Sequence, residues 1–195
     1  MIATDLNREY NIGEFKFINY VFLTHTQKIE ILKWRNQDVV REKMYNTDVI
    51  TEESHLSFIE SLKNKDDRSY WYVTKNGEYI GSYNIIDYCT IDSSCESGIF
   101  FKDTSLRSLN DNIIFAKSVY ELSFQKLGIE LMRGFVKKTN LFMINLTSYL
   151  GFSIKECDKD AYIKFEMTKK DFLILLNKRS VNMRDFINFT RNKQY

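Results

Sequence analysis

The sequence contains no proline and little glycine, cysteine or histidine: its 195 residues include seven glycines, three cysteines and two histidines. The absence of proline supports no functional conclusion. The cysteines, Cys89, Cys95 and Cys157, form no CxxC pair, and with His25 and His55 they match no zinc-ligand spacing. No structural metal site is therefore predicted. Unpaired cysteines are typical of a reducing cytosol, and the first residues show no basic flank before an apolar run. The expected location is the cytoplasm.

Long apolar runs and a strong charge imbalance are also missing. No stretch of about 18 uncharged apolar residues occurs, so no membrane-spanning helix is expected. The 28 basic and 26 acidic residues leave a net charge of +2, which gives no reason to expect a nucleic-acid or membrane partner. Apolar residues make up 44% and aromatic residues 15% of the chain, enough for one folded domain with a real core.

Hydrophobic periodicity predicts an α/β (α+β) fold with a mixed sheet and helices on both faces. The expected strands are 14–23, 68–75, 78–87, 95–102, 130–136, 152–157 and 161–167, and the expected helices begin near Thr26 and Thr51 or span 110–126, 140–150, 169–178 and 181–191. Asn76-Gly77 predicts a tight hairpin turn, and Gly128 and Gly151 predict helix ends. We expect a flexible arm at 1–13, a domain at 14–167 and a helical extension at 168–195 that packs on the domain or on a second subunit.

The stretch from Cys95 to Gly128 is the centre of the functional argument. A strand runs through a short connector, residues 103–109, into a long helix. Unpaired backbone N–H groups and the helix dipole favour an anion at such a helix start. The strand that follows, 130–136, can lie parallel to strand 95–102 through a right-handed crossover. The sequence therefore predicts an anion site at the end of a central strand.

Several segments together resemble the GNAT acyl-CoA N-acyltransferases. They are Trp34-Arg35-Asn36, the hairpin from Asn76 to Gly81, the strand–loop–helix at 96–112, and the segment Asn140-x-x-Met-Ile-Asn-Leu-x-x-Tyr-Leu-Gly-Phe152. Further segments, Met44-Tyr-Asn-Thr, residues 50–62 and Tyr70-Trp71, are similar to the nucleotide-sugar N-acetyltransferases of pseudaminic acid biosynthesis. The resemblance implies a sheet splayed between two parallel strands, acetyl-CoA as co-substrate without a metal, and a nucleotide-linked amino sugar as acceptor. It is also compatible with a homodimer.

The resemblance implies CoA contacts in three places. The family loop Gln/Arg-x-x-Gly-x-Gly/Ala falls on Arg107-x-x-Asn110-x-Asn112, where Arg107 matches and both glycine positions hold asparagine. Asparagine tolerates a left-handed backbone, so we expect the path of the loop to survive, whereas Asp111 is unfavourable beside a pyrophosphate unless it points away. The other implied contacts are a backbone N–H near Phe100 or Phe101 for the thioester carbonyl, and the side chains of Asn140 and Asn145. For Asn140 a plain helix cap is an alternative or an additional role.

Glu96 is the candidate general base, acting directly or through water, because its neighbours on the strand would bury it and raise its pKa. The alternative is a strand carboxylate paired with a neighbouring Lys or Arg. The family's general-acid tyrosine falls at Thr147, and Tyr149 lies on another side of the helix.

The expected acceptor site is a pocket for the sugar and the nucleotide. Its candidate residues are Arg35, Met44, Tyr45, His55, Trp71, Ser82 and Asn84. Their ordinary alternatives are core packing for Trp and Met, a structural or surface role for His55, and solvent-facing strand polarity for Ser82 and Asn84. Two other functions stay open: acetylation of protein N-termini, and a GNAT-fold binding module without turnover.

Overall fold

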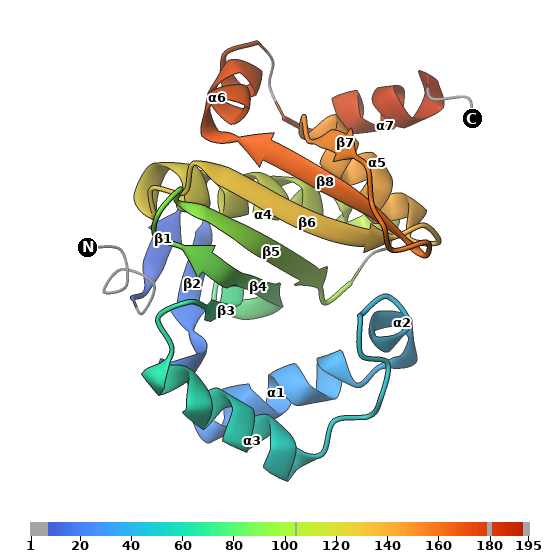
Figure 1. Ribbon diagram of the computed structural model, residues 1–195. Helices are drawn as coiled ribbons and strands as arrows, with labels where there is room; N and C mark the ends of the chain where they lie inside the picture. Colours follow the sequence, from blue (N-terminus) through green and yellow to red (C-terminus); the bar gives the residue numbers. More distant parts are fainter. Residues whose placement is uncertain (1–7, 104, 179–180, 193–195) are drawn as a thin grey trace.

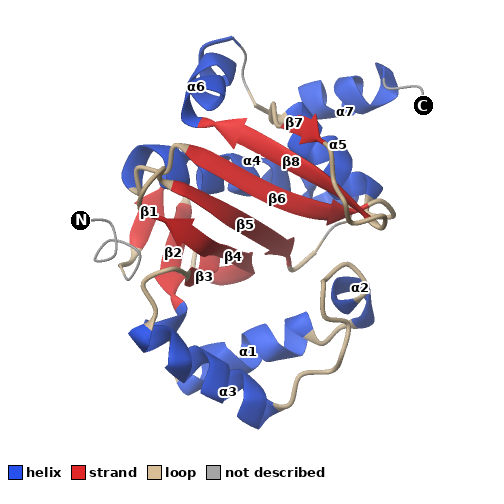
Figure 2. Cartoon of the chain, viewed as in Figure 1, coloured by secondary structure: helices blue, strands red, loops and turns tan. Residues whose placement is uncertain are grey.

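The computed structural model describes residues 8–103, 105–178 and 181–192, and it shows one mixed sheet with helices on both faces (Figures 1 and 2). The strands are β1 Tyr10–Ile12, β2 Phe15–Asn19, β3 Ser69–Lys75, β4 Glu78–Cys89, β5 Ser94–Phe101, β6 Leu131–Lys137, β7 Ser153–Lys155 and β8 Tyr162–Thr168. The α-helices are α1 His25–Arg35, α2 Asp38–Arg41, α3 Glu52–Ser61, α4 Leu109–Glu121, α5 Leu141–Tyr149, α6 Lys169–Lys178 and α7 Met183–Asn192. The predicted fold class is confirmed.

The eight strands lie in the order β1-β2-β3-β4-β5-β6-β8-β7, and β5 and β6 are the only parallel pair among them. Strand β5 is followed by α4 and then by β6, which is the crossover expected between parallel neighbours. The two strands that the sequence analysis placed at the centre therefore lie side by side in the middle of the sheet.

Successive side chains of a strand point to opposite faces of the sheet, so the core consists of two clusters, one on each face. Trp71, Tyr83 and Phe101 point toward α4 and belong to the larger cluster. Tyr72 and Tyr79 stack on each other, 4.5 Å between ring centroids, on the opposite face beneath α1 and α3. Helices α1 and α3 cover the face of β2–β4, and α4 and α5 cover the other face (Figure 1). The face of the sheet on which a side chain lies therefore decides which helical layer it meets.

The N-terminal part differs from the prediction in two respects. Residues 1–7 lie outside the described residues, but Tyr10–Ile12 pair with Phe15–Phe17 through a turn at Gly13, so the flexible arm expected over 1–13 is wrong for this edge strand. The cap of α1 is Thr24 rather than Thr26: its hydroxyl accepts from the Gln27 N–H, and the Gln27 side chain accepts from the Thr24 N–H.

The predicted turns are where the sequence placed them. Asn76 and Gly77 both have positive φ, 53° and 83°, as a type I′ hairpin requires. Gly128 and Gly151 also have positive φ, 69° and 91°, at the ends of the α4 and α5 segments. Before Gly128, α4 continues as a π-helical turn, Leu122–Lys126.

The C-terminal helices pack on this domain. Phe172 of α6 is fully buried against Phe124, and Phe186 of α7 packs against Tyr149 of α5. The Tyr149 hydroxyl also donates to the Asn182 carbonyl at 3.2 Å. These contacts pack α7 against α5 and stabilise the position of α5. A second subunit stays a prediction.

Candidate active site

The parallel strands β5 and β6 part midway along their length. Their paired residues run from Ser94 and Leu131 to Glu96 and Arg133, yet β5 continues to Phe101 and β6 to Lys137. The strands diverge toward the loops that follow them (Figure 1). At the point of divergence Gly134 faces Ser97, whose carbonyl oxygen would lie 3.3 Å from a Cβ at residue 134. The gap is thus a V with its apex at Glu96, Ser97 and Gly134.

Backbone N–H groups of β5 point into this gap. The Lys102 N–H donates to the Ile80 carbonyl of β4 at 2.8 Å. Successive N–H groups of a strand point to opposite sides, so the Phe100 N–H also faces β4, whereas the Ile99 and Phe101 N–H groups face the gap. Of the two expected oxyanion donors, the geometry therefore retains Phe101 and replaces Phe100 with Ile99.

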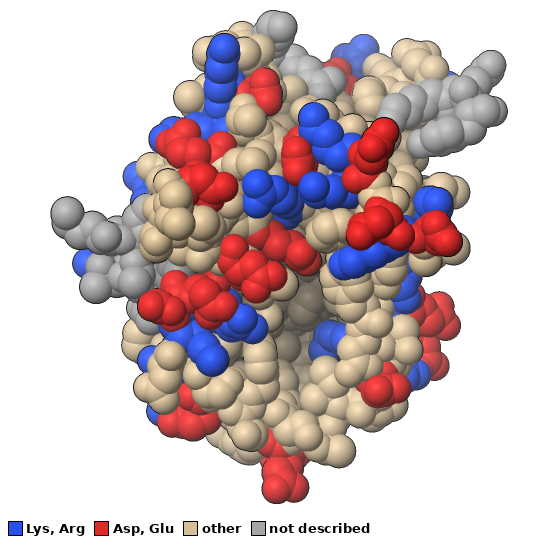
Figure 3. Space-filling view, viewed as in Figure 1, with Lys and Arg blue, Asp and Glu red and all other residues tan. Residues whose placement is uncertain are grey.

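A large cleft connects the V with the space beneath α1–α3. Its volume is about 1080 Å³, and its walls come from α1, α2, α3, β4, β5, β6 and α5. Figure 3 shows the hollow between the sheet and this helical layer. The predicted site residues that line it are Arg35, Met44, Tyr45, His55, Ser82, Asn84, Glu96, Phe100, Phe101 and Asn140. The structure therefore brings most of the predicted catalytic and acceptor-site residues into one cavity.

Trp71 does not reach this cleft. It is fully buried and stacks on Tyr83 at 5.3 Å on the α4 face of the sheet. Asn84 pairs across the strands with Tyr70, and Tyr70 lines the cleft. Cross-strand partners share a face of the sheet, so strict alternation from Asn84 would have selected Tyr70 from the sequence.

Glu96 lies on the cleft face of β5 at the apex of the V. Burial raises the pKa of its carboxyl group, the Lys159 charge lowers it, and Asp87 raises it further. Within the described residues its carboxylate has no hydrogen bond or ion pair. Glu96 therefore has the burial that was expected of a general base.

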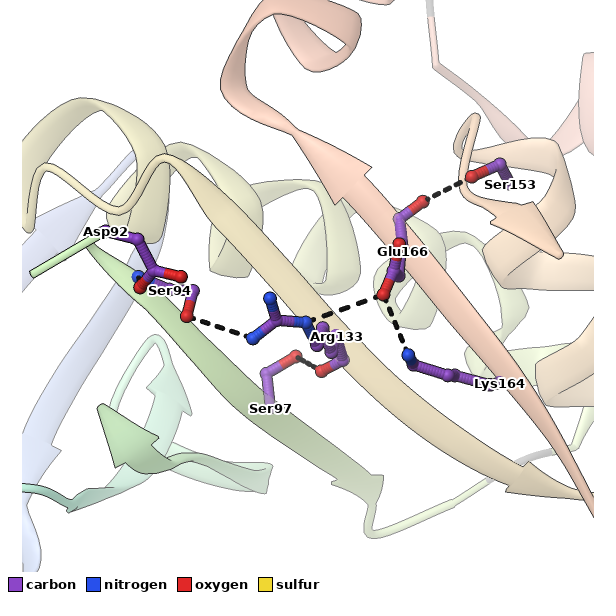
Figure 4. A network of polar contacts seen from close by, with 7 residues as sticks. All are labelled: Asp92, Ser94, Ser97, Arg133, Ser153, Lys164 and Glu166. Atoms are coloured by element: carbon purple, nitrogen blue, oxygen red, sulfur yellow. Dashed lines mark hydrogen bonds and ion pairs between the residues drawn. The ribbon is translucent and has the colours of Figure 1, made fainter. Parts of the chain in front are cut away.

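The strand partner of Glu96, Arg133, is engaged elsewhere. Its guanidinium donates to Ser94 Oγ at 2.9 Å and lies 3.5 Å from the Glu166 carboxylate, which also pairs with Lys164 at 2.9 Å (Figure 4). This network ties β5 to β6 and β8 just below the point where β5 and β6 part. The alternative interpretation, Glu96 as one half of a strand ion pair, receives no support from this geometry.

A segment of residues 36–50, called here the strap, closes one side of the cleft. The Asn36 side chain exchanges two hydrogen bonds with the Ile50 backbone, at 2.8 and 2.9 Å, which closes the strap at its base. Lys137 of β6 donates to the Glu42 carbonyl at 2.8 Å, and the Tyr45 ring lies 4.9 Å from that of Tyr162. The strap therefore spans from the helical layer to the far strands of the sheet.

Lys159 approaches the cleft from the β7–β8 connection. Its ammonium lies 4.4 Å from the Phe135 ring centroid and 5.1 Å from that of Tyr45. This side chain is exposed, and its charge acts on Glu96. The sequence analysis did not identify Lys159, because only the folded chain brings it beside Glu96.

Arg35 carries an unpaired donor in the cleft wall. One guanidinium nitrogen, Nη2, donates to the Asn46 carbonyl at 2.8 Å, whereas Nη1 is buried and has no partner among the described residues. Burial lowers the pKa of Arg35, and the nearby Arg41 lowers it further. A buried cationic N–H without an acceptor favours an anionic ligand group.

Two polar candidates are held by the protein itself. The Ser82 hydroxyl bonds with the phenols of Tyr20 and Tyr79, at 2.8 and 2.9 Å. His55 donates from Nε2 to the Lys28 carbonyl at 2.9 Å, and burial lowers its pKa. Both residues line the cleft, but their polar atoms bond to neighbouring residues and stabilise the wall, which agrees with the structural alternative for His55.

The loop before α4 does not use left-handed asparagines. Asn110 and Asn112 lie inside α4, and neither has positive φ, so the path of the loop does not depend on a left-handed asparagine. Instead, the buried Asn112 amide donates to the Asp103 carbonyl at 2.6 Å, and the Asp103 carboxylate accepts from Ser105 N–H and Ser108 Oγ at 2.8 and 2.7 Å. These bonds fold the connector tightly onto the start of the helix.

Two charged residues, Arg107 and Asp111, lie at the start of α4. Asp111 bonds Lys75 at 2.8 Å, so its negative charge is paired with a lysine. Arg107 is exposed and lines a recess of about 250 Å³ with Asp111 and Asn112, while Asn110 is exposed outside it. Arg107, Asp111 and Asn112 therefore lie outside the walls of the main cleft, whereas Asp103 at the start of the connector lines both the cleft and this recess.

On α5, Asn140 caps the helix: its Oδ1 accepts from the Met143 N–H at 3.3 Å. Its amide nitrogen has no partner within the described residues and remains available to a ligand. The Thr147 hydroxyl donates to the Met143 carbonyl at 2.7 Å, and that of Tyr149 bonds the Asn182 backbone. Asn145 is partly buried on α5 and does not line the cleft.

Neither a metal cluster nor a membrane helix is found in the part of the chain that the structure describes. No group of three or more His, Cys, Asp or Glu side chains is placed to hold a metal ion there. None of the helices there is long and apolar enough to cross a bilayer.

The arrangement of these parts defines a class of protein. A mixed sheet whose single parallel pair splays over a helix start, with a carboxylate at the apex, is the fold of the GNAT N-acetyltransferases. The chain is similar in sequence to proteins named acetyltransferase PseH and shares the fold of solved N-acetyltransferases, which supports an acetyl-CoA-dependent N-acetyltransferase. No family model matches the sequence.

The individual relatives and structures support this assignment. The acetyltransferase PseH of Campylobacter jejuni serotype O:23/36 is 29% identical over 140 residues, 71% of this chain and 85% of that protein. The crystal structure of C. jejuni N-acetyltransferase PseH in complex with acetyl coenzyme A has a TM-score of 0.63 at 21% identity, covering 79% of this chain and 98% of that one. The fold is also shared with the Vibrio cholerae spermidine N-acetyltransferase, with a TM-score of 0.72 at 12% identity, covering 83% of this chain and 99% of that one.

Proposed function

We propose that the protein transfers the acetyl group of acetyl-CoA to the amine of a nucleotide-linked amino sugar used in surface glycan synthesis. The observation that carries this proposal is the cleft itself. It joins a splayed strand pair with free N–H groups to a chamber that holds a half-buried carboxylate, Glu96, and a guanidinium nitrogen of Arg35 that has no partner among the described residues. The similarity to enzymes named acetyltransferase PseH supports the same reaction.

The residues of the V fit acetyl-CoA. The Ile99 and Phe101 N–H groups face the gap and can bond a carbonyl there, as a third strand would. The free amide of Asn140 lies in the wall on the β6 side. At the open end, the helix start at residues 105–112 offers backbone N–H groups and Arg107 to phosphates.

The reaction needs one proton acceptor and one oxyanion site. Glu96 takes a proton from the ammonium form of the acceptor, directly or through water, which leaves a nucleophilic amine. The amine nitrogen attacks the thioester carbonyl carbon, whose oxygen is held by a β5 N–H group. The carbon–nitrogen bond forms, the carbon–sulfur bond breaks, and the electron pair leaves with sulfur as a thiolate. The nitrogen gives its second proton to water, which leaves a neutral amide.

The charges of the cleft favour an acceptor that carries a diphosphate. Arg35, Lys43 and Lys102 line it, against the acids Glu96 and Asp103. A polyamine would meet repulsion from these cations, whereas a nucleoside diphosphate would pair with them. A protein N-terminus needs no such cations, so the same observation places peptide acetylation second.

A thiol-release assay tests the acceptor. UDP-linked 4-amino-4,6-dideoxy sugars should release CoA from acetyl-CoA, and peptides with free N-termini should not. Arg35→Gln should weaken binding of UDP, used alone as a probe, about tenfold or more, because a buried charge-assisted bond is lost. The control is Lys33→Gln, an exposed cation on the same helix. Turnover of peptides alone would reject the sugar acceptor.

Binding of the co-substrate is tested separately. A ligand that binds the native state raises the melting temperature, so millimolar CoA and acetyl-CoA should stabilise the protein. No stabilisation by either compound would reject the enzyme and leave the binding-module interpretation.

A further inference from the structure

The family's general-acid position holds a residue that cannot serve the leaving thiolate. The Thr147 hydroxyl lies on α5 in the cleft wall, but its proton is directed at the helix backbone, 2.7 Å from the Met143 carbonyl. Tyr149, two residues on, is bound to Asn182 beneath α7. Neither of these two hydroxyls is free to meet a sulfur atom. The third hydroxyl on α5, that of Ser148, has no partner among the described residues, but Ser148 does not line the cleft.

A different hydroxyl enters the same cavity from α4. Tyr120 lines the cleft, as Thr147 and Phe152 do, and its ring centroid lies 4.9 Å from that of Phe152. Its residue surface is only 4% exposed, yet its hydroxyl has no hydrogen-bond partner among the described residues.

The lack of a partner contrasts with the other buried phenols. Those of Tyr20 and Tyr79 bond Ser82, that of Tyr72 bonds Glu30, and that of Tyr83 bonds Ser123. The Tyr120 oxygen is not among the fully buried unpaired atoms, so it is open to the cleft that the residue lines, and a ligand in the cleft can accept its hydrogen bond.

Tyr120 shares its cavity with the apex of the V. Ser97, Gly134 and Tyr120 all line this cavity. Tyr120 belongs to α4, so it lines the cavity from the face of the sheet opposite to α1 and α3.

We propose that Tyr120 is a further catalytic residue, whose hydroxyl donates a hydrogen bond to the CoA sulfur as the carbon–sulfur bond breaks. This inference rests on the proposed function. Burial raises the pKa of Tyr120, so the phenol keeps its proton and stabilises the thiolate by hydrogen bonding. Glu96 passes the amine proton to solvent, and the released thiolate takes a proton from water.

The ionisation of bound CoA tests the proposal without an acceptor. The thiolate fraction is followed through pH by ultraviolet absorbance, as the difference between the CoA complex and the complex with desulfo-CoA. Tyr120→Phe should raise the pKa of the bound thiol and reduce the thiolate-to-thiol ratio about tenfold at a given pH, because a bond to the charged form is lost. Tyr88→Phe is the control, since this tyrosine belongs to the core but not to the cleft wall.

Turnover gives a second readout. With acetyl-CoA and a UDP-linked amino sugar, Tyr120→Phe should lower kcat about tenfold and leave the KM for acetyl-CoA within about twofold. An unchanged bound-thiol pKa in Tyr120→Phe would overturn the role of Tyr120 and leave the proposed function intact. Failure of the wild-type protein to bind CoA would overturn both.

Discussion

Glu96 and Arg133 are the last residues that pair β5 with β6, and their side chains do not neutralise each other. Arg133 is bound to Ser94 and Glu166, and Glu96 is left in the cleft at the apex of the V. The separation matters because a general base must be able to accept a proton, and a tight ion pair with arginine would lower its pKa. Of this cross-strand pair, Arg133 thus holds the strands together, and Glu96 remains available to accept a proton.

Replacing the candidate base should remove proton transfer and leave binding intact. We expect Glu96→Gln to lower kcat/KM about 100-fold near neutral pH, because general base catalysis typically contributes that much. The wild-type rate should fall with decreasing pH as Glu96 takes up a proton, at a higher pH than for an ordinary glutamate, because burial raises its pKa. This fall should be absent in Glu96→Gln. Glu121→Gln, on α4 and paired with Lys117, is the control. A pH–rate profile shared by both variants and the wild type would remove Glu96 as the base.

Lys159 should tune this pH dependence. Its positive charge favours the ionised form of Glu96, so Lys159→Met should raise the pKa of Glu96 and move the acid limb of the kcat/KM profile to higher pH. Methionine retains an apolar chain against Tyr45 and Phe135. Lys155→Met, whose charge acts on Glu166, should leave the limb in place. An acid limb moved to lower pH would contradict the prediction.

Two glycines of the central strands should respond differently to alanine. A Cβ at Gly81 would collide with the Phe100 carbonyl oxygen and lie 2.8 Å from the Phe115 ring, so Gly81→Ala should reduce the free energy of unfolding by about 2–4 kcal/mol. A Cβ at Gly98 meets only the Asn84 amide, at 2.7 Å, which can rotate. Gly98→Ala should cost below about 1 kcal/mol and raise the KM for the acceptor, since Asn84 lines the cleft. Urea denaturation compares the two, and equal losses of stability would contradict this difference.

The asparagines at the start of α4 give a matched pair. Asn110 is exposed and helical, so Asn110→Ala should be neutral or stabilising by about 0.5 kcal/mol. Asn112→Ala should cost about 1–2 kcal/mol, because the Asp103 carbonyl loses a buried donor. Thermal unfolding measures both. A loss above about 1 kcal/mol in Asn110→Ala would indicate that this residue needs a conformation other than the helical one.

Much of the fold could be predicted because its signals are local. The Asn76-Gly77 turn, the glycines that end α4 and α5, and the alternation of β3 to β5 each depend on a few neighbouring residues. Because β5, α4 and β6 follow one another in the chain, a right-handed crossover that makes β5 and β6 parallel neighbours is the expected arrangement. Two local predictions were wrong. Thr24 and Thr26 are equally good helix caps by residue type, so the sequence did not distinguish them. The strand β1 is too short to show an alternating pattern.

The candidate site could be predicted only in part, for a physical reason. From the sequence one can tell that a polar strand residue, Glu96, precedes a helix start and that Arg35 belongs to a separate helix. The folded chain is needed to show that both line one cleft and that the charge of Lys159 acts on Glu96. The folded chain also shows that Trp71 faces the core and that the Tyr120 hydroxyl has no partner among the described residues. Whether a buried polar atom is satisfied depends on groups brought from distant parts of the chain, and no local pattern records that.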